Sequence, residues 1–203
     1  MAALIRAATL KDFPAEIAVV ISNRADAPGL VLASTEGIST VTIESKPFGK
    51  DRAAFEAVLQ SALESHRIDL ICLGGFMRLF TAEFVQRWYG KMLNIHPSLL
   101  PSFPGLDPHG QALHAGVKIS GATVHFVTPE TDAGPIVMQG VVPVRDDDTS
   151  EALSARILAI EHQIYPAALR LLACGKLRLD GAICRLDGDT CVNDTLISPQ
   201  PAL

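Results

Sequence analysis

The residues best suited to chemistry lie in the segment LNIHPSLLPSFP (93–104), at the end of a short apolar run. Asn94 and His96 stand two positions apart in a predicted strand, so their side chains project from the same face. An amide can donate a hydrogen bond to a developing oxyanion, and a histidine can donate a second bond or transfer a proton. Taken alone, this pair is weak evidence of an active site, because a histidine at a strand end is more often part of the hydrogen-bonded structure.

Three apolar runs predict the strands that position this pair. They lack strict alternation, which is typical of strands buried on both faces of a parallel sheet. The runs cover residues 16–22, 68–75 and 92–96. Helices are predicted at residues 51–66 and 81–89. Strands and helices that alternate in this way predict an open α/β sheet, in which ligands bind beyond the carboxyl ends of the strands.

The predicted helices have recognisable faces and starts. In the helix at residues 51–66 an apolar stripe with a 3.6-residue period is formed by Phe55, Val58, Leu59 and Leu63. The helix at residues 81–89 begins with Thr81 as its N-cap. Residues 1–10 are also helical in pattern, but no strand precedes them.

The second half of the chain predicts two strands, one long helix and a hairpin. The strands are expected at residues 122–127 and 136–144, the helix from Thr149 to about residue 173, and the hairpin at residues 176–191 with a turn near 187–189. Pro166 lies inside the long helix and is expected to kink it or divide it in two. The last residues, 192–203, are expected to form a loose tail.

Composition limits the function classes. The chain has 203 residues, of which 48% are hydrophobic and 19% are charged, and this predicts one globular domain. A net charge of −5 argues against nucleic acid as the main partner. No apolar run is long enough to span a membrane, and no signal peptide is evident. The four cysteines form no C-x-x-C pair and no metal site is predicted, so reduced thiols in the cytoplasm are expected.

Several segments together resemble the folate-dependent formyltransferases over nearly the whole chain. These segments are ISNRADAPGL (21–30), LGGFMRLF (73–80), NIHPSLLP (94–101), VHFVTPETDAGPIVMQ (124–139) and EHQIYPAALRLLACGKL (161–177). They are most similar to family members that formylate glycinamide ribonucleotide in purine synthesis. The resemblance implies a single domain over residues 1–203, with a Rossmann-like, open, mostly parallel twisted sheet and helices on both of its faces.

The resemblance also implies a mechanism. An amine attacks the formyl carbon of 10-formyltetrahydrofolate, which serves as cosubstrate, and the carbonyl oxygen becomes an oxyanion. Asn94 and His96 would stabilise that oxygen, and Asp132 would favour the charged histidine and assist proton transfer. Without the resemblance, Asp132 is more simply a turn former in the sequence Asp-Ala-Gly-Pro.

Binding residues follow from the same resemblance. The folate is expected to contact Arg52, Met77, Arg78, Leu79, Phe80, Asn94, Thr128, Pro129, Glu130, Thr131 and Asp132. Glu161 matches a residue that binds the amine substrate. On sequence alone, Arg52 and Glu161 are equally well read as solvated helix residues. His125 is expected to support the site rather than to catalyse, and His109 to cap a helix near it. A monomer or a homodimer is expected, without a metal and without a membrane contact.

The sequence departs from the family at its start. Members begin with a strand and a Gly-Asn-Gly-Ser-Asn type of loop that cradles the substrate phosphate at a helix N-terminus, a segment of roughly twenty residues. Here that segment is absent, and either a late start assignment or a real loss would explain it. The folate site and the catalytic trio are expected to remain, with weak binding of the phosphorylated substrate. Leu158 also replaces a residue that is polar in the family.

Three alternatives remain open. A formyltetrahydrofolate deformylase would use water as the acceptor, but it usually has a second histidine where this chain has Pro97. A methionyl-tRNA formyltransferase would add a C-terminal domain and a basic surface. A folate-binding remnant without catalysis would not be expected to keep Asn94, His96 and Asp132 together.

Overall fold

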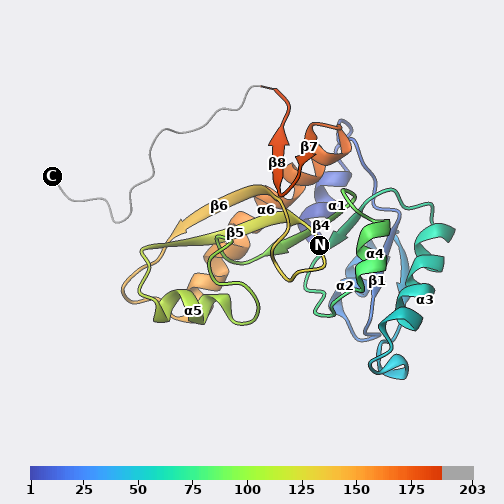
Figure 1. The fold of residues 1–203 in the computed structure, drawn as a ribbon, viewed down its shortest axis with the longest axis horizontal. Coiled ribbons are helices and arrows are strands. Elements are labelled where there is room, and N and C mark those ends of the chain that lie inside the picture. Colours follow the sequence, from blue (N-terminus) through green and yellow to red (C-terminus); the bar gives the residue numbers. More distant parts are fainter. Residues whose placement is uncertain (189–203) are drawn as a thin grey trace.

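The computed structural model describes residues 1–188 of the chain (Figure 1). The helices are α1 (Ala2–Ala8), α2 (Pro28–Thr35), α3 (Arg52–Ser65), α4 (Ala82–Arg87), α5 (Pro108–His114) and α6 (Ser150–Ala173), with a 3-10 turn η1 (Lys46–Phe48). The strands are β1 (Val19–Ser22), β2 (Ser39–Thr42), β3 (Ile71–Leu73), β4 (Met92–His96), β5 (Ile119–Phe126), β6 (Ile136–Pro143), β7 (Leu177–Asp180) and β8 (Ile183–Leu186). The expected open α/β architecture is therefore confirmed.

Strand pairing changes direction along the chain. The pair β1–β2 is parallel, and so is the pair β3–β4. The sheet then continues through the antiparallel pairs β4–β5 and β5–β6, in the order β3-β4-β5-β6. Among the described residues, no strand hydrogen bonds join β1–β2 to this four-stranded sheet. Both β1 and β3 are only half-buried along their whole lengths, whereas Met92 and Leu93 of β4 are 1% and 0% exposed.

Helices cover both faces of the sheet, and strand β4 divides the core between them. Leu93 belongs to a cluster with Leu153 and Ile157 of α6. Its neighbour Met92 points the other way, into a cluster formed with side chains of α3 and α4 such as Phe55. The long helix α6 follows the sheet across β5 and β6 (Figure 1).

The predicted helix starts are confirmed. Asp51, Thr81 and Thr149 each accept a hydrogen bond from the backbone N–H three residues later, at the beginnings of α3, α4 and α6. The predicted stripe on α3 is wrong at one position. Val58 is 45% exposed, and Glu56 takes a buried place on that helix instead, at 5% exposed.

Two further expectations are corrected. Helix α6 is continuous through Pro166, so the predicted division of the helix at this proline is wrong; buried residues on both sides, including Tyr165 and Ala168, pack it against the sheet. The C-terminal hairpin exists as β7–β8, but its turn lies at residues 181–182, where Gly181 adopts a φ of 60°. The turn that joins the two strands of the hairpin is therefore not the one predicted near 187–189. Cys191 and the tail at 192–203 lie outside the described residues.

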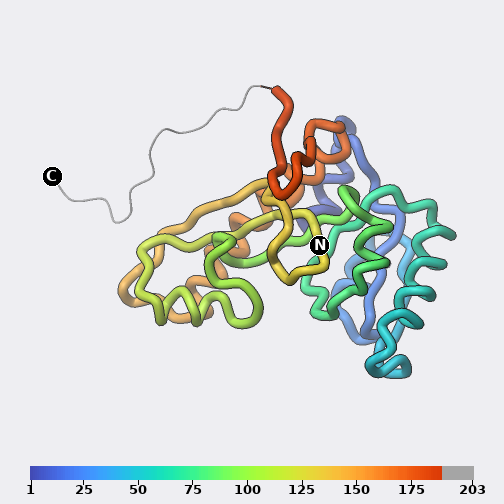
Figure 2. Tube along the Cα trace, viewed as in Figure 1, coloured from blue at the N-terminus to red at the C-terminus, as the bar shows by residue number. Residues whose placement is uncertain are grey.

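The strand and helix boundaries mostly shift by a few residues. Strands β1 and β3 are shorter than predicted, and β5 begins at Ile119 rather than at residue 122. Position 121 inside β5 requires glycine, because a Cβ there would stand 1.9 Å from the carbonyl oxygen of Gly140 on β6. At the start of the chain, α1 packs on α6 and α2, and Figure 2 shows the N-terminus projecting onto the middle of the trace. Burial lowers the pKa of the Met1 ammonium group.

Candidate active site

Strand β4 brings the two predicted polar side chains to one edge of the sheet. Asn94 lies directly opposite His125 of β5, and His96 lies opposite Thr123. The amide Nδ2 of Asn94 is 3.1 Å from Nε2 of His125. Side chains on directly opposed residues share a face, so this pairing places the amide and both histidines together.

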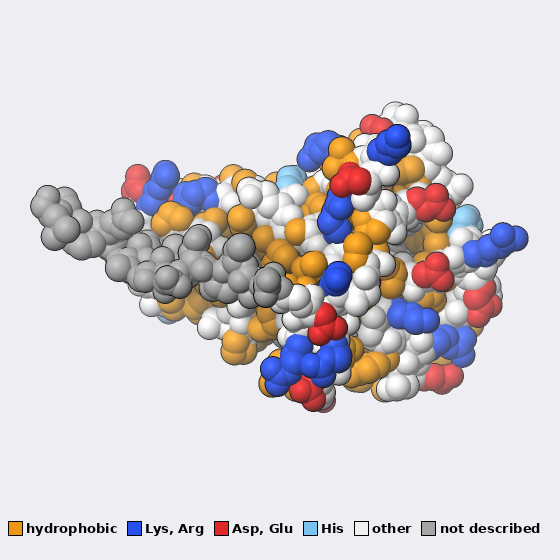
Figure 3. Space-filling model, turned by 90° about the horizontal axis from the view of Figure 1, so that it is seen from above, with side chains coloured by type: hydrophobic (Ala, Val, Ile, Leu, Met, Phe, Trp, Pro, Cys, Tyr) orange, Lys and Arg blue, Asp and Glu red, His pale blue; other side chains and the backbone are white. Residues whose placement is uncertain are grey.

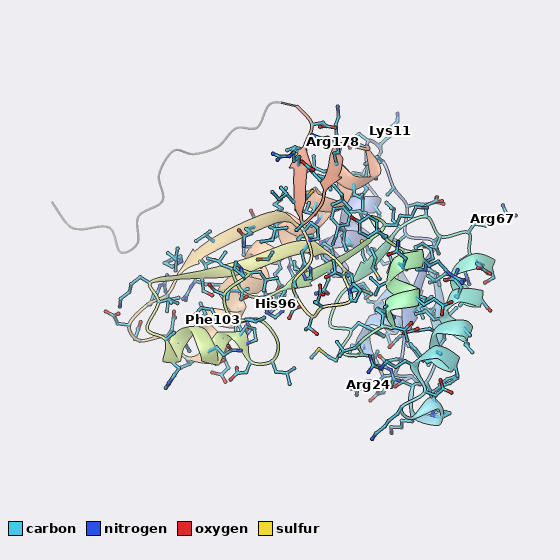
Figure 4. All side chains as sticks on the ribbon, in the orientation of Figure 1. Lys11, Arg24, Arg67, His96, Phe103 and Arg178 are labelled. Carbon is cyan, nitrogen blue, oxygen red and sulfur yellow. The ribbon has the colours of Figure 1, made fainter. Side chains whose placement is uncertain are left out.

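The ring of His96 has an acceptor at each nitrogen. Its Nε2 is 2.9 Å from the carbonyl oxygen of Phe103, and Figure 4 shows the two residues side by side. Its Nδ1 is 3.4 Å from Oδ2 of Asp132. The residue is only 6% exposed, so water competes little for these contacts. A ring held in this way can donate from both nitrogens when it is protonated.

The carboxylate of Asp132 joins three parts of the site. Its Oδ2 accepts a hydrogen bond from the backbone N–H of Gly105 at 2.9 Å, in addition to facing His96. Its Oδ1 is 3.8 Å from Nε2 of His125. The residue has a φ of 52°, which is uncommon for a side chain other than glycine. The loop between β5 and β6 thus turns tightly and directs this carboxylate inward, with only 11% of the side chain exposed.

His125 holds the Asn94 amide and lies close to Asp132, whereas the sequence predicted only a supporting role for it. Its Nδ1 lies 2.9 Å from the carbonyl oxygen of Phe126 and can only donate there. Its Nε2 therefore carries the lone pair and accepts from the Asn94 amide. Burial lowers the pKa of His125, which favours the neutral ring, while the Phe126 carbonyl and Asp132 act in the opposite direction. The link depends on the β4–β5 register, and no local pattern in the sequence reveals that register.

The loop after β4 is fixed to the sheet by hydrogen bonds. The hydroxyl of Thr123 donates to the carbonyl oxygen of Ser98 at 2.7 Å and accepts from the Leu100 N–H at 3.0 Å. Gln139 of β6 donates to the carbonyl oxygen of Leu100 at 2.9 Å. Because Thr123 is fully buried, these bonds hold the loop close to His96 without competition from water.

Residues 77–80, predicted to contact folate, belong with Phe76 to a segment without regular secondary structure between β3 and α4. Phe76, Arg78 and Phe80 are half-buried, whereas Met77 and Leu79 are 73% and 56% exposed. This alternation gives the segment one face toward the protein and one apolar face toward solvent. The guanidinium of Arg78 lies 5.0 Å from the ring centroid of Phe55 and donates to the Gly49 carbonyl oxygen at 3.3 Å.

The other predicted contact residues lie on the loop after β5 and at the start of α3. Thr128 is half-buried, and its hydroxyl donates to the carbonyl oxygen of Glu130 at 3.2 Å. The rest of this loop is exposed up to Asp132, at Pro129, Glu130 and Thr131. Arg52 is exposed at the first turn of α3 and makes no hydrogen bond or ion pair with any described residue.

Helix α6 presents Glu161, the predicted amine-binding residue. Its side chain is half-buried, and burial raises the pKa of its carboxyl group, while the nearby Met1 ammonium acts in the opposite direction. Leu158, one turn earlier on α6, is 48% exposed.

The expectation that His109 caps a helix is wrong. Helix α5 begins at Pro108, so Asp107 is its N-cap and accepts from the Gly110 N–H at 3.1 Å. His109 instead lies in the first turn, and its Nε2 is buried without a hydrogen-bond partner among the described residues. Burial lowers the pKa of this ring, and the nearby His96 adds to the shift.

Residues 1–188 contain no group of three or more His, Cys, Asp or Glu side chains that could hold a metal ion. No helix in the same part of the chain is both long and apolar enough to cross a membrane. Cys72, Cys174 and Cys184 are free thiols.

Comparison with known proteins gives matches over most of the chain. The family model described as formyl transferase matches residues 1–169. A phosphoribosylglycinamide formyltransferase from Haemophilus influenzae is 44% identical, over 87% of this chain and 83% of its own length. The solved structure of glycinamide ribonucleotide transformylase 1 from Symbiobacterium toebii has a TM-score of 0.88 and 45% identity, and the match covers 92% of this chain and 87% of that one.

A longer relative matches equally well. The trifunctional purine biosynthetic protein adenosine-3 of Bos taurus is 50% identical over 86% of this chain, but the matched part is only 17% of that protein. The chain therefore corresponds to one part of the trifunctional protein and to most of the bacterial one.

Proposed function

This chain belongs to the formyl transferase family, and on that premise we propose that it transfers a formyl group from 10-formyltetrahydrofolate to the amino group of glycinamide ribonucleotide in purine biosynthesis. The observation that carries the proposal is the buried contact between His96 and Asp132, together with Asn94, which lies on the same strand as His96. Two donors and a carboxylate at a strand end suit the attack of an amine on a formyl group. The bacterial relatives that are named for this activity match this chain over most of their length.

The proposed reaction begins at the formyl carbon. The substrate amine attacks it, a C–N bond forms, and the carbonyl oxygen becomes an oxyanion. One N–H of the Asn94 amide is directed to His125, so the second N–H remains available for this oxygen. A donor of this kind is worth about 10²–10³ in rate.

Collapse of the intermediate breaks the bond between the formyl carbon and N10 of the folate. His96 donates the proton that the departing nitrogen needs, and Asp132 stabilises the imidazolium before that transfer. The attacking amine must also lose a proton, and Asp132, the carboxylate that faces His96, is proposed to receive it through a water molecule. Because Gly105 donates to Oδ2, the carboxylate is held in place during both transfers.

The folate is proposed to lie along segment 76–80, against Met77, Arg78, Leu79 and Phe80. The exposure of Met77 and Leu79 supports this placement, because an apolar pair that faces solvent beside a catalytic cluster can cover a flat ring. The remaining proposed folate contacts are Arg52, Thr128, Pro129, Glu130, Thr131 and Asp132. Glu161 is proposed to bind the amine substrate, because its half-buried carboxylate lies on the long helix that crosses the sheet.

Residues 1–203 are proposed to form one formyltransferase domain whose sheet takes one further strand between β1 and β3. The lack of strand hydrogen bonds between these two strands supports this, as does the half-burial of both. An edge of this kind leaves backbone groups and apolar side chains without partners. The added strand would also carry a phosphate-binding loop toward α1.

The protein is proposed to act in the cytoplasm as a monomer or homodimer on small-molecule substrates, without nucleic acid. Figure 3 supports the expectation that nucleic acid is not a partner, since basic and acidic side chains are interspersed on the face that it shows.

The proposal is tested by assaying this chain, and a version extended upstream to the next start codon, with 10-formyltetrahydrofolate and glycinamide ribonucleotide. Transfer by either chain supports the function, and transfer by the extended chain alone supports the added strand as well. Release of formate without transfer by both chains would mean that the protein is a deformylase. Folate binding without either reaction would mean that the trio does not catalyse.

A further inference from the structure

Glu56 is a buried carboxylate without a cation. It is 5% exposed on α3, and no described Lys, Arg or His forms an ion pair with it. Both carboxylate oxygens instead accept hydrogen bonds from one residue, Thr81. Oε1 accepts from the Thr81 backbone N–H at 2.6 Å, and Oε2 accepts from its hydroxyl. Burying a charged group without such bonds is costly, so the pairing is required wherever Glu56 stays buried.

Thr81 occupies the point where the proposed folate segment ends. It directly follows Phe80, and its hydroxyl oxygen also accepts from the Phe84 N–H at 3.2 Å, as the N-cap of α4. The hydroxyl hydrogen is therefore directed to Glu56 and the lone pair to the helix. Glu56 thus fixes the backbone and the side chain of Thr81, and with them the end of segment 76–80.

Phe55, the residue before Glu56, packs against the same segment. Phe55 stacks with Phe76 at a ring-centroid distance of 6.4 Å, Phe76 with Phe80 at 5.0 Å, and Phe80 with Phe84 at 4.7 Å. Helix α3 therefore holds the inner face of the segment through aromatic rings and its end through Glu56. Met77 and Leu79 are left on the outer face.

We propose that Glu56 is a positioning residue for folate binding: it sets the path of segment 76–80 through Thr81, without touching the folate or the reacting atoms. The inference rests on the proposed function, since it assigns a task to the segment that we expect to hold the folate. Among the hydrogen bonds recorded for the described residues, none joins Glu56 to Asn94, His96 or Asp132. Loss of Glu56 should therefore weaken folate binding and leave the chemical step nearly unchanged.

The test is the variant Glu56→Gln, whose amide has one acceptor where the carboxylate has two. The dissociation constant for 10-formyltetrahydrofolate, measured by calorimetry, is expected to rise by about tenfold, because a hydrogen bond to a charged group is lost. In steady-state assays the KM for the folate should rise by a similar factor. The KM for the amine substrate and kcat should stay within about twofold of the wild type.

A second pair of variants approaches the contact from the other side. Thr81→Ser keeps the hydroxyl and is expected to bind folate like the wild type, whereas Thr81→Val loses the hydroxyl and should weaken binding as Glu56→Gln does. This pair decides the question if Glu56→Gln does not fold. Equal folate affinity of Thr81→Ser and Thr81→Val would overturn the inference.

Gln60 provides the matched structural control. It lies one turn after Glu56 on α3 and accepts from Nε1 of Trp88, a residue that follows α4, at 2.9 Å. Gln60→Leu removes a side-chain hydrogen bond of the same helix away from segment 76–80, so it should lower the unfolding temperature and leave folate affinity unchanged. An equal loss of affinity in Gln60→Leu and Glu56→Gln would show that general destabilisation is responsible.

The dissociation constant separates the two proposals. If the wild type binds folate and does not transfer the formyl group, the proposed function fails while the effect of Glu56→Gln on binding is still measured. If the wild type transfers the group and Glu56→Gln binds folate normally, only the positioning role fails.

Discussion

The substitution Asp132→Asn examines the charge at the centre of the site while preserving its shape. In the wild type, Oδ2 accepts from the Gly105 N–H at 2.9 Å and faces Nδ1 of His96 at 3.4 Å. An asparagine can place its own Oδ1 in the same position and keep both contacts. The variant should therefore fold, and its main loss is the negative charge beside the His96 ring.

The expected magnitude follows from what that charge does. A positioned acid or base contributes about 10²–10⁴ in rate, and Asp132 is proposed both to stabilise the His96 imidazolium and to receive the amine proton. The new amide group would also face Nε2 of His125, 3.8 Å from Oδ1 in the wild type, where it competes with Asn94 for one lone pair. We expect kcat to fall by about 10²–10³ while the folate KM changes by less than about threefold.

The assay is steady-state formyl transfer from pH 5 to 9, with Asp107→Asn as the control. Asp107 is a nearby carboxylate that caps α5, and asparagine caps a helix equally well, so this variant should retain kcat within about twofold. A loss of less than about tenfold in Asp132→Asn, with an unchanged pH profile, would refute the assigned role of Asp132. A similar loss in both variants would show that the two substitutions act only through the general negative potential.

Three other predictions concern His125, the cysteines and the core. Because burial lowers the pKa of His125, the unfolded chain binds more protons at this residue than the folded chain does. This contribution to stability is therefore present above the ordinary histidine pKa of about 6.5 and is lost as the pH falls below it. Urea unfolding at pH 7.5 and 5.5 should show a smaller pH effect in His125→Gln than in the wild type, and an equal effect would contradict the assignment. Burial raises the pKa of the Cys72 thiol to about 11, so iodoacetamide at pH 8 should label the exposed Cys174 and spare Cys72 until the chain unfolds, as peptide mass spectrometry can show. Ile157→Ala removes a fully buried side chain and should lower the free energy of unfolding by about 2–5 kcal/mol, whereas Leu158→Ala, at a 48% exposed position, should change it by less than about 1 kcal/mol.

Local signals in the sequence predict those elements whose cause is local. The N-caps Asp51, Thr81 and Thr149 need only a side chain three residues before a backbone N–H, and the structure confirms the helices at Thr81 and Thr149. Strand β4 has the predicted bounds because Pro97 directly follows its last residue, His96. Asn94 and His96 follow from the alternation of side chains along that strand.

The errors concern interactions between distant parts of the chain. Val58 fits the apolar period of α3, yet the buried place belongs to Glu56 because Thr81 offers it two hydrogen bonds. The strand predicted from residue 122 begins at Ile119 and includes Gly121, where the close approach of β6 leaves no room for a Cβ. The link from His125 to Asn94 depends on the β4–β5 register, and the inward direction of Asp132 depends on a tight turn that brings it to Gly105.

The most direct test of the central claim is a single turnover with 10-formyltetrahydrofolate that carries a labelled formyl group, at saturating glycinamide ribonucleotide, in the wild type and in His96→Ala. The extended chain serves if the present one binds the amine substrate weakly. We expect the label to appear on the substrate amine in the wild type, and its rate of appearance to fall by at least about 10² in His96→Ala. Label released as formate by the wild type, or transferred at an unchanged rate by His96→Ala, would contradict that claim.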